Sequence, residues 1–358
     1  MTTDPDIHPA RLEALFRSLV AVYSPSGKEE EVLSLLEDFC SEHGVPHGVQ
    51  PVDGERYNLV LGHPAAELVF VGHVDTVEAW DLDTVGPLDL GGGRVGGLGT
   101  ADMKGGCAAM LEAFLVLRDS GLGNRIGLAL VVGEEGEGDG AATFLREARP
   151  GRVIVGEPTG MKLCTGHYGY VEAAFRASGR TVHASLPELG ENAAEALLKA
   201  LHDLIGSGEL REALGAVVNI RHLETAWSGF AVPDRARAWV DLHVPPEVSV
   251  DHLCEMVSRL VARSGDPRVE VTFPTAHGGY QLPEDDPLVK SYREVWGGEL
   301  DVFRSHSDAN LFQAVGVPAY VLGPGLLETA HTEEEQVELA EVLDAARCYV
   351  ALARAFLC

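Results

Sequence analysis

The feature that most constrains the fold is an alternation of short apolar runs with helical segments in the first half of the chain. Runs typical of buried strands lie at 67–71 (ELVFV), 126–132 (IGLALVV) and 153–155 (VIV). Between them, the Ala- and Leu-rich segments 103–119 and 141–148 have the composition and length of helices. Strands that are apolar on both faces and alternate with helices are typical of a mostly parallel sheet with helices on both faces. We therefore predict an α/β fold for this part of the chain.

A second pattern begins near residue 171. Strand-like and helical segments follow in the order 171–177, 191–206, 216–220, 236–244, 249–264 and 269–273. Strand–helix–strand–strand–helix–strand is the ferredoxin-like order. After it the first pattern returns, with a helix near 286–296, a strand at 318–322 and a final helix. We predict a larger α/β domain, 1–170 and 276–358, into which a smaller α+β domain, 171–275, is inserted.

Two short motifs predict where helices begin. Ser26 and Glu29 fit the S-x-x-E capping box, and the helix that follows would end at Gly44. Thr332 and Glu335 form the same pattern before the last helix. Both motifs predict that these side chains bind the first turn of a helix.

Composition excludes several classes of partner. The net charge of −28 argues against nucleic acid and anionic membranes, both of which require basic surfaces. No stretch approaches the roughly 18 to 20 apolar residues of a membrane span. The six cysteines show no CxxC spacing, so we expect reduced thiols and a cytoplasmic protein. Three explanations of the acidic excess remain open: high solubility, a host with a salty cytoplasm, and attraction of cationic substrates.

Acidic and imidazole side chains follow the predicted strands of the larger domain. The set comprises His73, Asp75, Asp102, Glu134, Glu135, Glu157 and His331. Ligands in open parallel sheets bind beyond the carboxyl ends of the strands, so these side chains are expected at one edge. Five carboxylates at one place repel each other strongly unless cations lie between them. A mixture of imidazole and carboxylate ligands without thiolates suits zinc, manganese or cobalt.

Each signal alone has an ordinary structural reading. A histidine near a strand end often packs in the core or lies on the surface without a functional role. Asp102, before a Gly-rich helix start, could be a helix cap. The segment GEEGEGDG could be a solvated acidic loop, Glu157 a turn residue and His331 part of a cap region. The joint occurrence of all of them at one end of one sheet favours a metal site.

The ordered motifs GHVDTV, GLGTADMKGG, GEEGEG, GEPTG, GRTVHAS and HTEEE resemble the M20 family of metallopeptidases and deacylases. Within it, the sequence is most similar to the branch of acetylornithine deacetylase and succinyl-diaminopimelate desuccinylase. The resemblance covers nearly the whole chain, including the inserted domain. It implies a hydrolase with two zinc ions, for which cobalt or manganese could substitute.

The resemblance also implies roles for individual residues. His73 and Glu157 would bind one zinc, Glu135 and His331 the other, and Asp102 would bridge them. Asp75 would hydrogen-bond His73 and hold its tautomer. Glu134 would be the general base, which takes a proton from the attacking water and returns it to the departing amine. His183, in GRTVHAS, would stabilise the oxyanion from the other subunit, which requires a homodimer formed through the inserted domain.

Two positions depart from the family pattern. Relatives often carry an Asn and an Arg that help to hold the substrate carboxylate, whereas Phe230 and His243 occupy those places here. Arg235, Arg237 or Arg304 could substitute for the missing arginine. On the basis of the motif set and the Gly-Glu-Pro-Thr sequence, the leading hypothesis is cleavage of an N-acyl amino acid of the acetylornithine type. The alternatives are a di- or tripeptidase or carboxypeptidase of the same fold, and a metal-binding protein without activity.

Overall fold

The computed structural model describes residues 7–79, 85–226 and 229–358, and divides the chain into two compact units. The first comprises 1–165, 282–303 and 307–358, and the second comprises 166–281 and 304–306. The inserted segment therefore extends several residues beyond the range 171–275 at both ends. Among the described residues, no helix is both long and apolar enough to cross a membrane.

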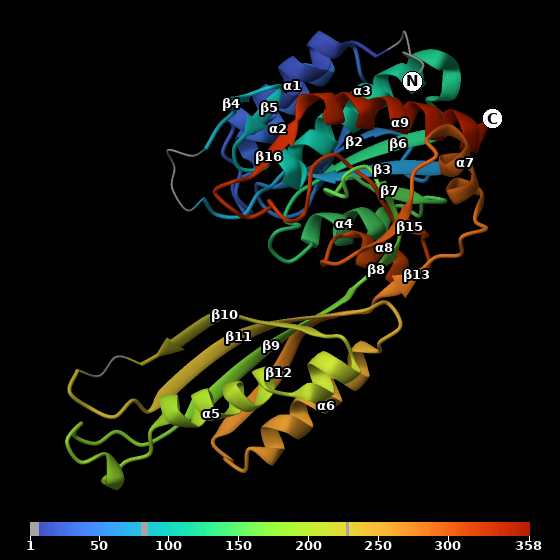
Figure 1. Cartoon of the computed structure of the whole chain (residues 1–358). Coiled ribbons are helices and arrows are strands. Elements are labelled where there is room, and N and C mark those ends of the chain that lie inside the picture. The colour runs from blue at the N-terminus through green and yellow to red at the C-terminus, as the bar shows by residue number, and fades with distance from the viewer. Residues whose placement is uncertain (1–6, 80–84, 227–228) are drawn as a thin grey trace. The chain divides into compact units, whose positions relative to one another are not determined.

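The first unit is built around a nine-stranded sheet (Figure 1). Its strands are β1 (His47–Pro51), β2 (Tyr57–Gly62), β3 (Leu68–His73), β6 (Ile126–Val131), β7 (Val153–Val155), β8 (Leu163–His167), β13 (Tyr280–Gln281), β14 (Leu300–Phe303) and β15 (Ala319–Val321). Strand β13 and the last two residues of β8 belong to the residue range of the second unit. The central strands β6, β3, β7 and β15 are mutually parallel, as predicted. Antiparallel strands flank this centre, β2 and β1 on one side and β8 and β13 on the other. The sequence pattern did not indicate these flanking strands.

Helices cover both faces of this sheet, which confirms the predicted α/β class (Figure 1). The helices are α1 (Pro9–Ala21), α2 (Glu30–Glu42), α3 (Gly105–Leu117), α4 (Asp139–Glu147), α7 (Pro287–Val295), α8 (Ala309–Ala314) and α9 (Leu339–Leu357). Helices α1, α3 and α9 pack together on one face, and α4 and α8 lie on the other. Helix α3 is buried along its whole length, which explains why its sequence is apolar all round.

A small separate sheet ties distant segments of the first unit together. It contains β4 (Leu88–Gly91), β5 (Arg94–Gly96) and β16 (Gln336–Glu338). Strand β16 pairs antiparallel with β5, so residues near 336 lie beside residues near 96.

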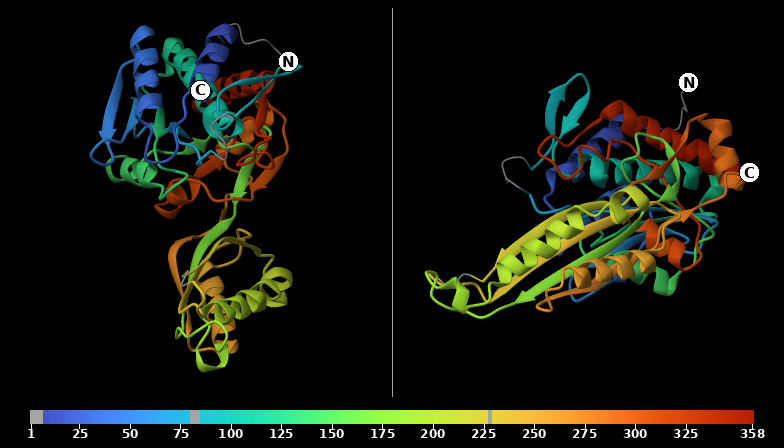
Figure 2. Two further views of the ribbon diagram at one scale, coloured as in Figure 1. Left: turned by 90° about the vertical axis from the view of Figure 1, so that its left-hand side faces the viewer. Right: turned by 60° about the horizontal axis from the view of Figure 1, so that its bottom comes forward.

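The second unit has the predicted ferredoxin-like order. Its elements are β9 (Gly169–Ser178), α5 (Ala193–Ile205), β10 (Val217–Thr225), β11 (Arg235–Val244), α6 (Val250–Arg263) and β12 (Val269–His277). The four strands form one antiparallel sheet in the order β10-β11-β9-β12. Both helices lie on the same face of this sheet, as the two views of Figure 2 show.

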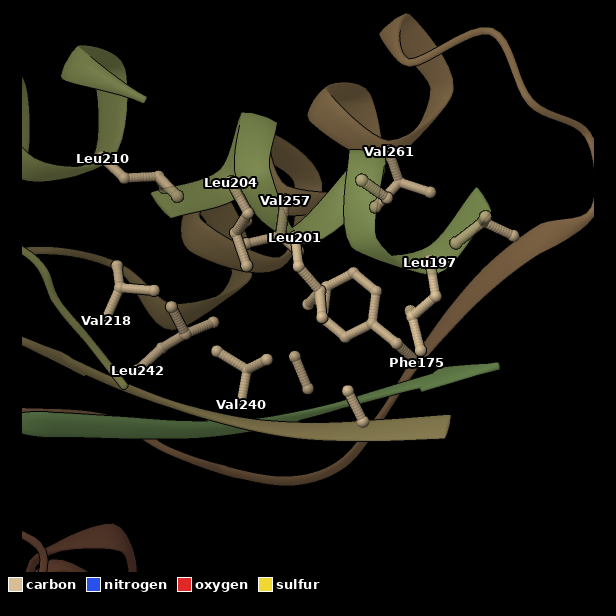
Figure 3. Close-up of a cluster of buried hydrophobic side chains, with 14 of the residues drawn as sticks. Phe175, Leu197, Leu201, Leu204, Leu210, Val218, Val240, Leu242, Val257 and Val261 are labelled. Atoms are coloured by element: carbon tan, nitrogen blue, oxygen red, sulfur yellow. The ribbon is translucent and has the colours of Figure 1, made fainter. Parts of the chain in front are cut away.

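The core of the second unit is aliphatic and aromatic (Figure 3). Leu197, Leu201 and Leu204 of α5 pack with Val257 of α6 over Phe175 of β9. Alternate residues of β9 are buried, because successive side chains of a strand point to opposite faces. Only one face of this sheet is therefore apolar.

Both predicted capping boxes are wrong. Helix α2 begins after Glu29 without a side-chain cap, and α9 begins after Glu338, also without one. The hydroxyl of Ser26 donates instead to the Asp75 carboxylate. The Glu335 carboxylate accepts hydrogen bonds from the backbone before α3. The S-x-x-E pattern is local and does not reveal a partner that is distant in the sequence.

Candidate metal centre

Six ionisable side chains gather where the parallel strands of the first unit end. They are His73, Asp102, Glu134, Glu135, Glu157 and His331. Strand β3 ends at His73, β6 ends shortly before Glu134, and β7 ends shortly before Glu157. Parallel strands place their carboxyl ends at one edge, so the topology brings these residues together.

Asp102 lies at the middle of this group. Its Oδ1 is 3.1 Å from Nε2 of His73, and its Oδ2 is 3.3 Å from Nε2 of His331. Glu157 Oε1 lies 3.7 Å from His73 Nε2, and Glu135 Oε1 lies 2.7 Å from His331 Nε2. The group therefore divides into a His73 side and a His331 side that share Asp102.

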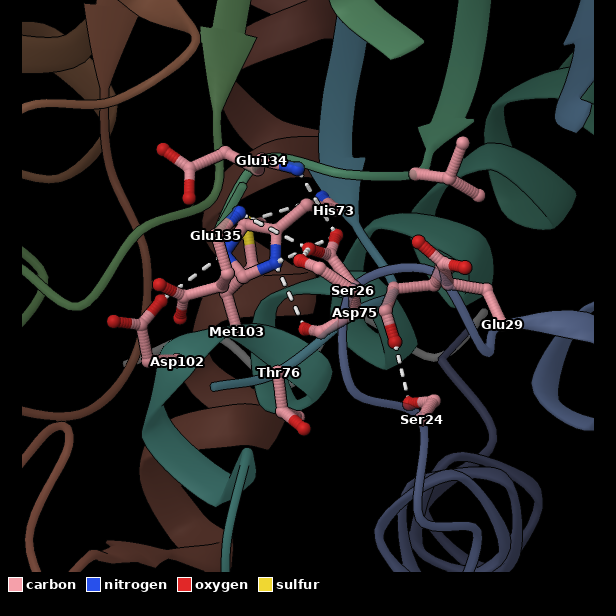
Figure 4. Close-up of polar contacts among 12 residues, drawn as sticks. Ser24, Ser26, Glu29, His73, Asp75, Thr76, Asp102, Met103, Glu134 and Glu135 are labelled. Atoms are coloured by element: carbon pink, nitrogen blue, oxygen red, sulfur yellow. Dashed lines mark hydrogen bonds and ion pairs between the residues drawn. The ribbon is translucent and has the colours of Figure 1, made fainter. Parts of the chain in front are cut away.

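Asp75 is buried beside the group and contacts both His73 and the loop that carries Glu134 and Glu135 (Figure 4). Its two carboxylate oxygens accept hydrogen bonds from the backbone N–H groups of Glu134 and Glu135, at 3.2 and 3.0 Å. The Nδ1 atom of His73 is 3.0 Å from the Asp75 backbone oxygen and 3.6 Å from its carboxylate. The backbone carbonyl is thus the nearer acceptor for that nitrogen, and the carboxylate mainly holds the loop that carries Glu134 and Glu135.

The turn after β6 aims Glu134 and Glu135 in different directions. Gly133 has φ +74, a conformation that residues with a Cβ rarely adopt, and an added Cβ would lie 2.2 Å from Asp139 Oδ1. In Figure 4 the Glu135 carboxylate lies beside that of Asp102, whereas the Glu134 carboxylate points elsewhere. Glu134 is half-buried. The pair can therefore divide two tasks, one side chain binding a metal and the other handling a proton.

The electrostatics of both histidines show that the site favours positive charge. Burial alone would lower the pKa of His73, but Glu157 and the hydrogen bond to Asp102 outweigh it and raise that pKa well above its usual value. Burial likewise opposes protonation of His331, yet Asp102 and Glu135 raise its pKa to about 11. The carboxylates around each imidazole thus favour positive charge at this place.

The pKa values of the carboxylates also indicate that negative charge is in excess at this site. Burial and the nearby charge of Asp102 raise the pKa of Glu157 to about 8. Burial and neighbouring carboxylates also raise the pKa of Glu134 well above its usual value. Glu157 Oε1 is buried and has no hydrogen-bond partner, which is costly for a carboxylate unless a cation binds it.

The donor set fits divalent transition metals. His73, Asp102 and Glu135 offer ligand atoms that all lie within 4.8 Å of one another. Two atoms that each lie about 2.0 Å from one tetrahedral zinc are roughly 3.3 Å apart, close to the separations around Asp102. The Cys107 thiol nearby is not a ligand, because it donates to the His73 backbone oxygen and burial raises its pKa to about 12. The residues here that could hold a metal ion are therefore imidazoles and carboxylates.

His183, the predicted oxyanion donor, is outside the first unit, which carries the residues of the candidate metal centre. It belongs to the second unit and lies in the loop between β9 and α5. Its side chain is exposed, and its Nδ1 is 2.8 Å from the Ser185 hydroxyl. An exposed imidazole on the inserted unit is available to a substrate or to another chain.

The positions that depart from the family pattern also lie in the second unit. Phe230 is 90% exposed, and the half-buried ring of His243 lies 5.1 Å from that of Tyr170. The arginines named as substitutes are exposed and have their own partners. Those contacts are Arg235 with Asp234, Arg237 with Glu224, and Arg304 with the Tyr168 ring.

Two further residues near the centre were not anticipated from the sequence. The Ser26 hydroxyl binds Asp75, as described above. Asp308 is buried, and burial together with Asp75 and Asp139 raises its pKa to about 7. Asp308 directly precedes α8 without capping it. The sequence patterns described above do not identify Asp308 as a residue that is buried near this centre.

Comparison with known proteins agrees with this geometry. The family model for peptidase family M20/M25/M40 matches residues 69–355. The chain belongs to this family. It is 30% identical over 362 residues to an acetylornithine deacetylase of Salmonella typhimurium, covering 90% of this chain and 92% of that protein. M20 proteins act on amide and peptide bonds, so the chain is a hydrolase of this class.

Solved structures of the family share the fold. A tripeptidase from Staphylococcus aureus superposes with a TM-score of 0.77 at 21% identity, covering 98% of this chain and 99% of that one. An M20 family metallo-carboxypeptidase from Sulfolobus solfataricus also has a TM-score of 0.77, at 17% identity, covering 97% and 99%. The M20 fold thus carries more than one activity on amide bonds, and the fold alone does not select among them.

Proposed function

We propose that this chain is a two-zinc hydrolase that cleaves the amide bond of an N-acyl amino acid, as an acetylornithine deacetylase does. The observation that carries the proposal is the sharing of Asp102 by two ligand sets. One set is His73, Asp102 Oδ1 and Glu157, and the other is His331, Asp102 Oδ2 and Glu135. Catalytic zinc sites commonly have three protein ligands and leave one position for water or substrate.

The chain's own residues would divide the chemistry between them. Bound metal ions would lower the pKa of a water molecule and polarise the amide carbonyl. Glu134 would accept the proton of the attacking water and then deliver it to the departing amine. Its pKa, raised by burial and by neighbouring carboxylates, suits a group that must both take up and release a proton. Asp75 would hold the Glu134 loop through two backbone N–H groups.

The inserted unit would act as a lid and as the dimerisation domain. The exposed His183 would donate to the oxyanion, and we propose that it does so from the partner subunit. Phe230 lies in the segment that bridges to this loop, where Ala231 pairs with His183, and its 90% exposure leaves an apolar ring for another surface to cover.

The test is amine release from N-acetyl and N-succinyl amino acids and from unblocked di- and tripeptides, using metal-loaded protein with E134Q as the blank. Metal content would be measured on the same samples. We expect about two zinc ions per chain and cleavage of an acylated amino acid. A protein that binds two metals and cleaves none of the acylated substrates contradicts the deacylase assignment.

A peptidase is the second candidate. The observation that favours it is that the chain shares its fold with a tripeptidase and with a metallo-carboxypeptidase. The same metal centre would then cleave a peptide bond. Faster hydrolysis of unblocked tripeptides than of any N-acyl amino acid would favour this candidate.

A further inference from the structure

Glu335 is a buried carboxylate that contacts the segment carrying Asp102. It is 3% exposed, and its Oε1 accepts hydrogen bonds from the backbone N–H groups of Ala101 and Asp102, at 3.0 and 3.1 Å. A buried carboxylate that accepts two backbone N–H groups restrains the orientation of the peptide to which they belong. The side chain therefore fixes the backbone from which Asp102 projects.

The backbone of Glu335 is held to the same segment. Its carbonyl accepts the N–H of Gly97 at 3.0 Å, and the next residue, Gln336, pairs with Gly96 in the β5–β16 ladder. Its own N–H donates to the Thr332 carbonyl at 3.2 Å. Glu335 is thus attached to residues 96–102 through both its main chain and its side chain.

This attachment joins two metal-ligand loops. His331 lies one short turn before Glu335 in the same loop, and its Nε2 is 3.3 Å from Asp102 Oδ2. The other oxygen of Asp102 faces His73, which β3 positions independently of this loop. Glu335 therefore connects Asp102 directly to the loop of His331, whereas its link to the His73 side passes through Asp102 itself.

Asp75 shows the same construction on the neighbouring loop. Its carboxylate accepts two successive N–H groups, those of Glu134 and Glu135, and so holds the other ligand of the His331 side. Two buried carboxylates, each bound to a pair of consecutive backbone N–H groups, thereby support Asp102 and Glu135. Groups that orient metal ligands commonly change metal affinity by about 10- to 100-fold when they are removed.

We propose that Glu335 is a positioning residue that sets the spacing between Asp102 and His331, and with it the affinity of the metal position formed by His331, Glu135 and Asp102. The inference rests on the proposed two-metal site. It predicts an unequal effect, in which the position of His331 weakens more than that of His73 and Glu157, because Glu335 holds both Asp102 and the loop of His331 on the first side and Asp102 alone on the second. A purely structural role would weaken both positions together with the fold.

The test is zinc titration of metal-free protein against a chromophoric chelator, together with the visible spectrum of the cobalt-loaded protein. E335L removes the acceptor while filling its space, E335Q keeps an oxygen acceptor, and E334A alters the exposed neighbour. We expect two zinc equivalents in the wild type and in E334A. We expect E335L to lose about 10- to 100-fold affinity at one equivalent, a smaller factor at the other, and to alter the cobalt spectrum. E335Q should restore most of the lost affinity.

Equal affinities for both equivalents in E335L and the wild type would overturn the inference, as would an equal loss at both. If E335L does not fold, E335D decides by the same titration, because it keeps the charge but withdraws the acceptor by one methylene. Unchanged affinities or an equal loss at both equivalents in E335D would then overturn the inference, and a larger loss at one equivalent than at the other would support it. A wild type that binds fewer than two zinc ions contradicts the proposed function itself, whatever the variants do.

Discussion

The first unit buries ionisable side chains at the edge of its sheet, whereas the second buries aliphatic and aromatic side chains between its sheet and two helices. In the first, buried carboxylates lie close together around Asp102, and burial with the charge of Asp102 raises the pKa of Glu157 to about 8. In the second, a core around Phe175 and Leu197 requires no compensation, because apolar burial is favourable by itself. The comparison teaches that the first unit should depend on bound cations for stability and activity, and that the second should depend on packing.

The largest expected effect is on catalysis in the first unit. E134Q removes the proton acceptor while keeping the shape of the side chain, so kcat should fall by about 10²- to 10⁴-fold. Metal content and thermal unfolding should stay near the wild type. Steady-state kinetics beside metal analysis checks this, with the exposed Glu137 of the same loop as the control in E137Q. Equal loss in both variants would show that the loop, and not the carboxylate, matters.

Packing of the second unit is tested by two adjacent leucines of α5. Leu197 is fully buried and Leu198 is 52% exposed, so the two alanine variants remove the same atoms from different surroundings. L197A should lower the free energy of unfolding by about 2–5 kcal/mol because it leaves a cavity, and L198A should change it by less than about 0.5 kcal/mol. Urea denaturation measures both. Similar costs would mean that α5 is not packed as described.

His183 is expected to link the second unit to catalysis. Loss of one oxyanion donor costs about 10²- to 10³-fold in kcat, so H183A should show a loss of this size without a change in stability. H202A, which removes an exposed histidine of the same unit, is the matched control. Mixing H183A with E134Q tests action between subunits, because a hybrid dimer would regain one complete site. No regain of activity in the mixture would place His183 in its own subunit's site.

Metal removal should destabilise the first unit and leave the second unit unchanged. A ligand that binds only the folded state, present at 100 times its Kd, stabilises that state by about 2.7 kcal/mol per site. Chelation should therefore lower the melting temperature and accelerate hydrogen exchange in the peptides around His73 and Glu135. Peptides from α5 should exchange as before. Equal acceleration in both sets would mean that the units unfold as one.

The smallest effect is expected at Ser26. S26A removes one hydrogen bond to Asp75, worth roughly 1 kcal/mol, and should weaken zinc binding modestly because the Glu134–Glu135 loop loses part of its support. S34A, at an exposed position of α2, is the control. Zinc titration and thermal unfolding of both variants measure the difference. Identical behaviour would show that Asp75 is held well enough by the two backbone N–H groups.

The sequence alone determined the α/β class, the ferredoxin-like insertion and membership of a family of amide hydrolases. These features depend on local periodicity and on the order of motifs, both of which are written along the chain. It also predicted that His73, Glu134, Glu135 and Glu157 would follow strands. Parallel pairing then brings them to one edge whatever the details of packing.

Only the tertiary structure decided which of these groups contact each other and what supports them. The two S-x-x-E motifs each indicated a helix cap. Ser26 instead binds Asp75, and Glu335 binds the backbone of Asp102, from which it is separated by more than 200 residues in the chain. A serine or glutamate can satisfy a nearby helix end or a distant partner with hydrogen bonds of similar strength. Packing of distant segments chooses between them, because it determines which donors and acceptors are buried together.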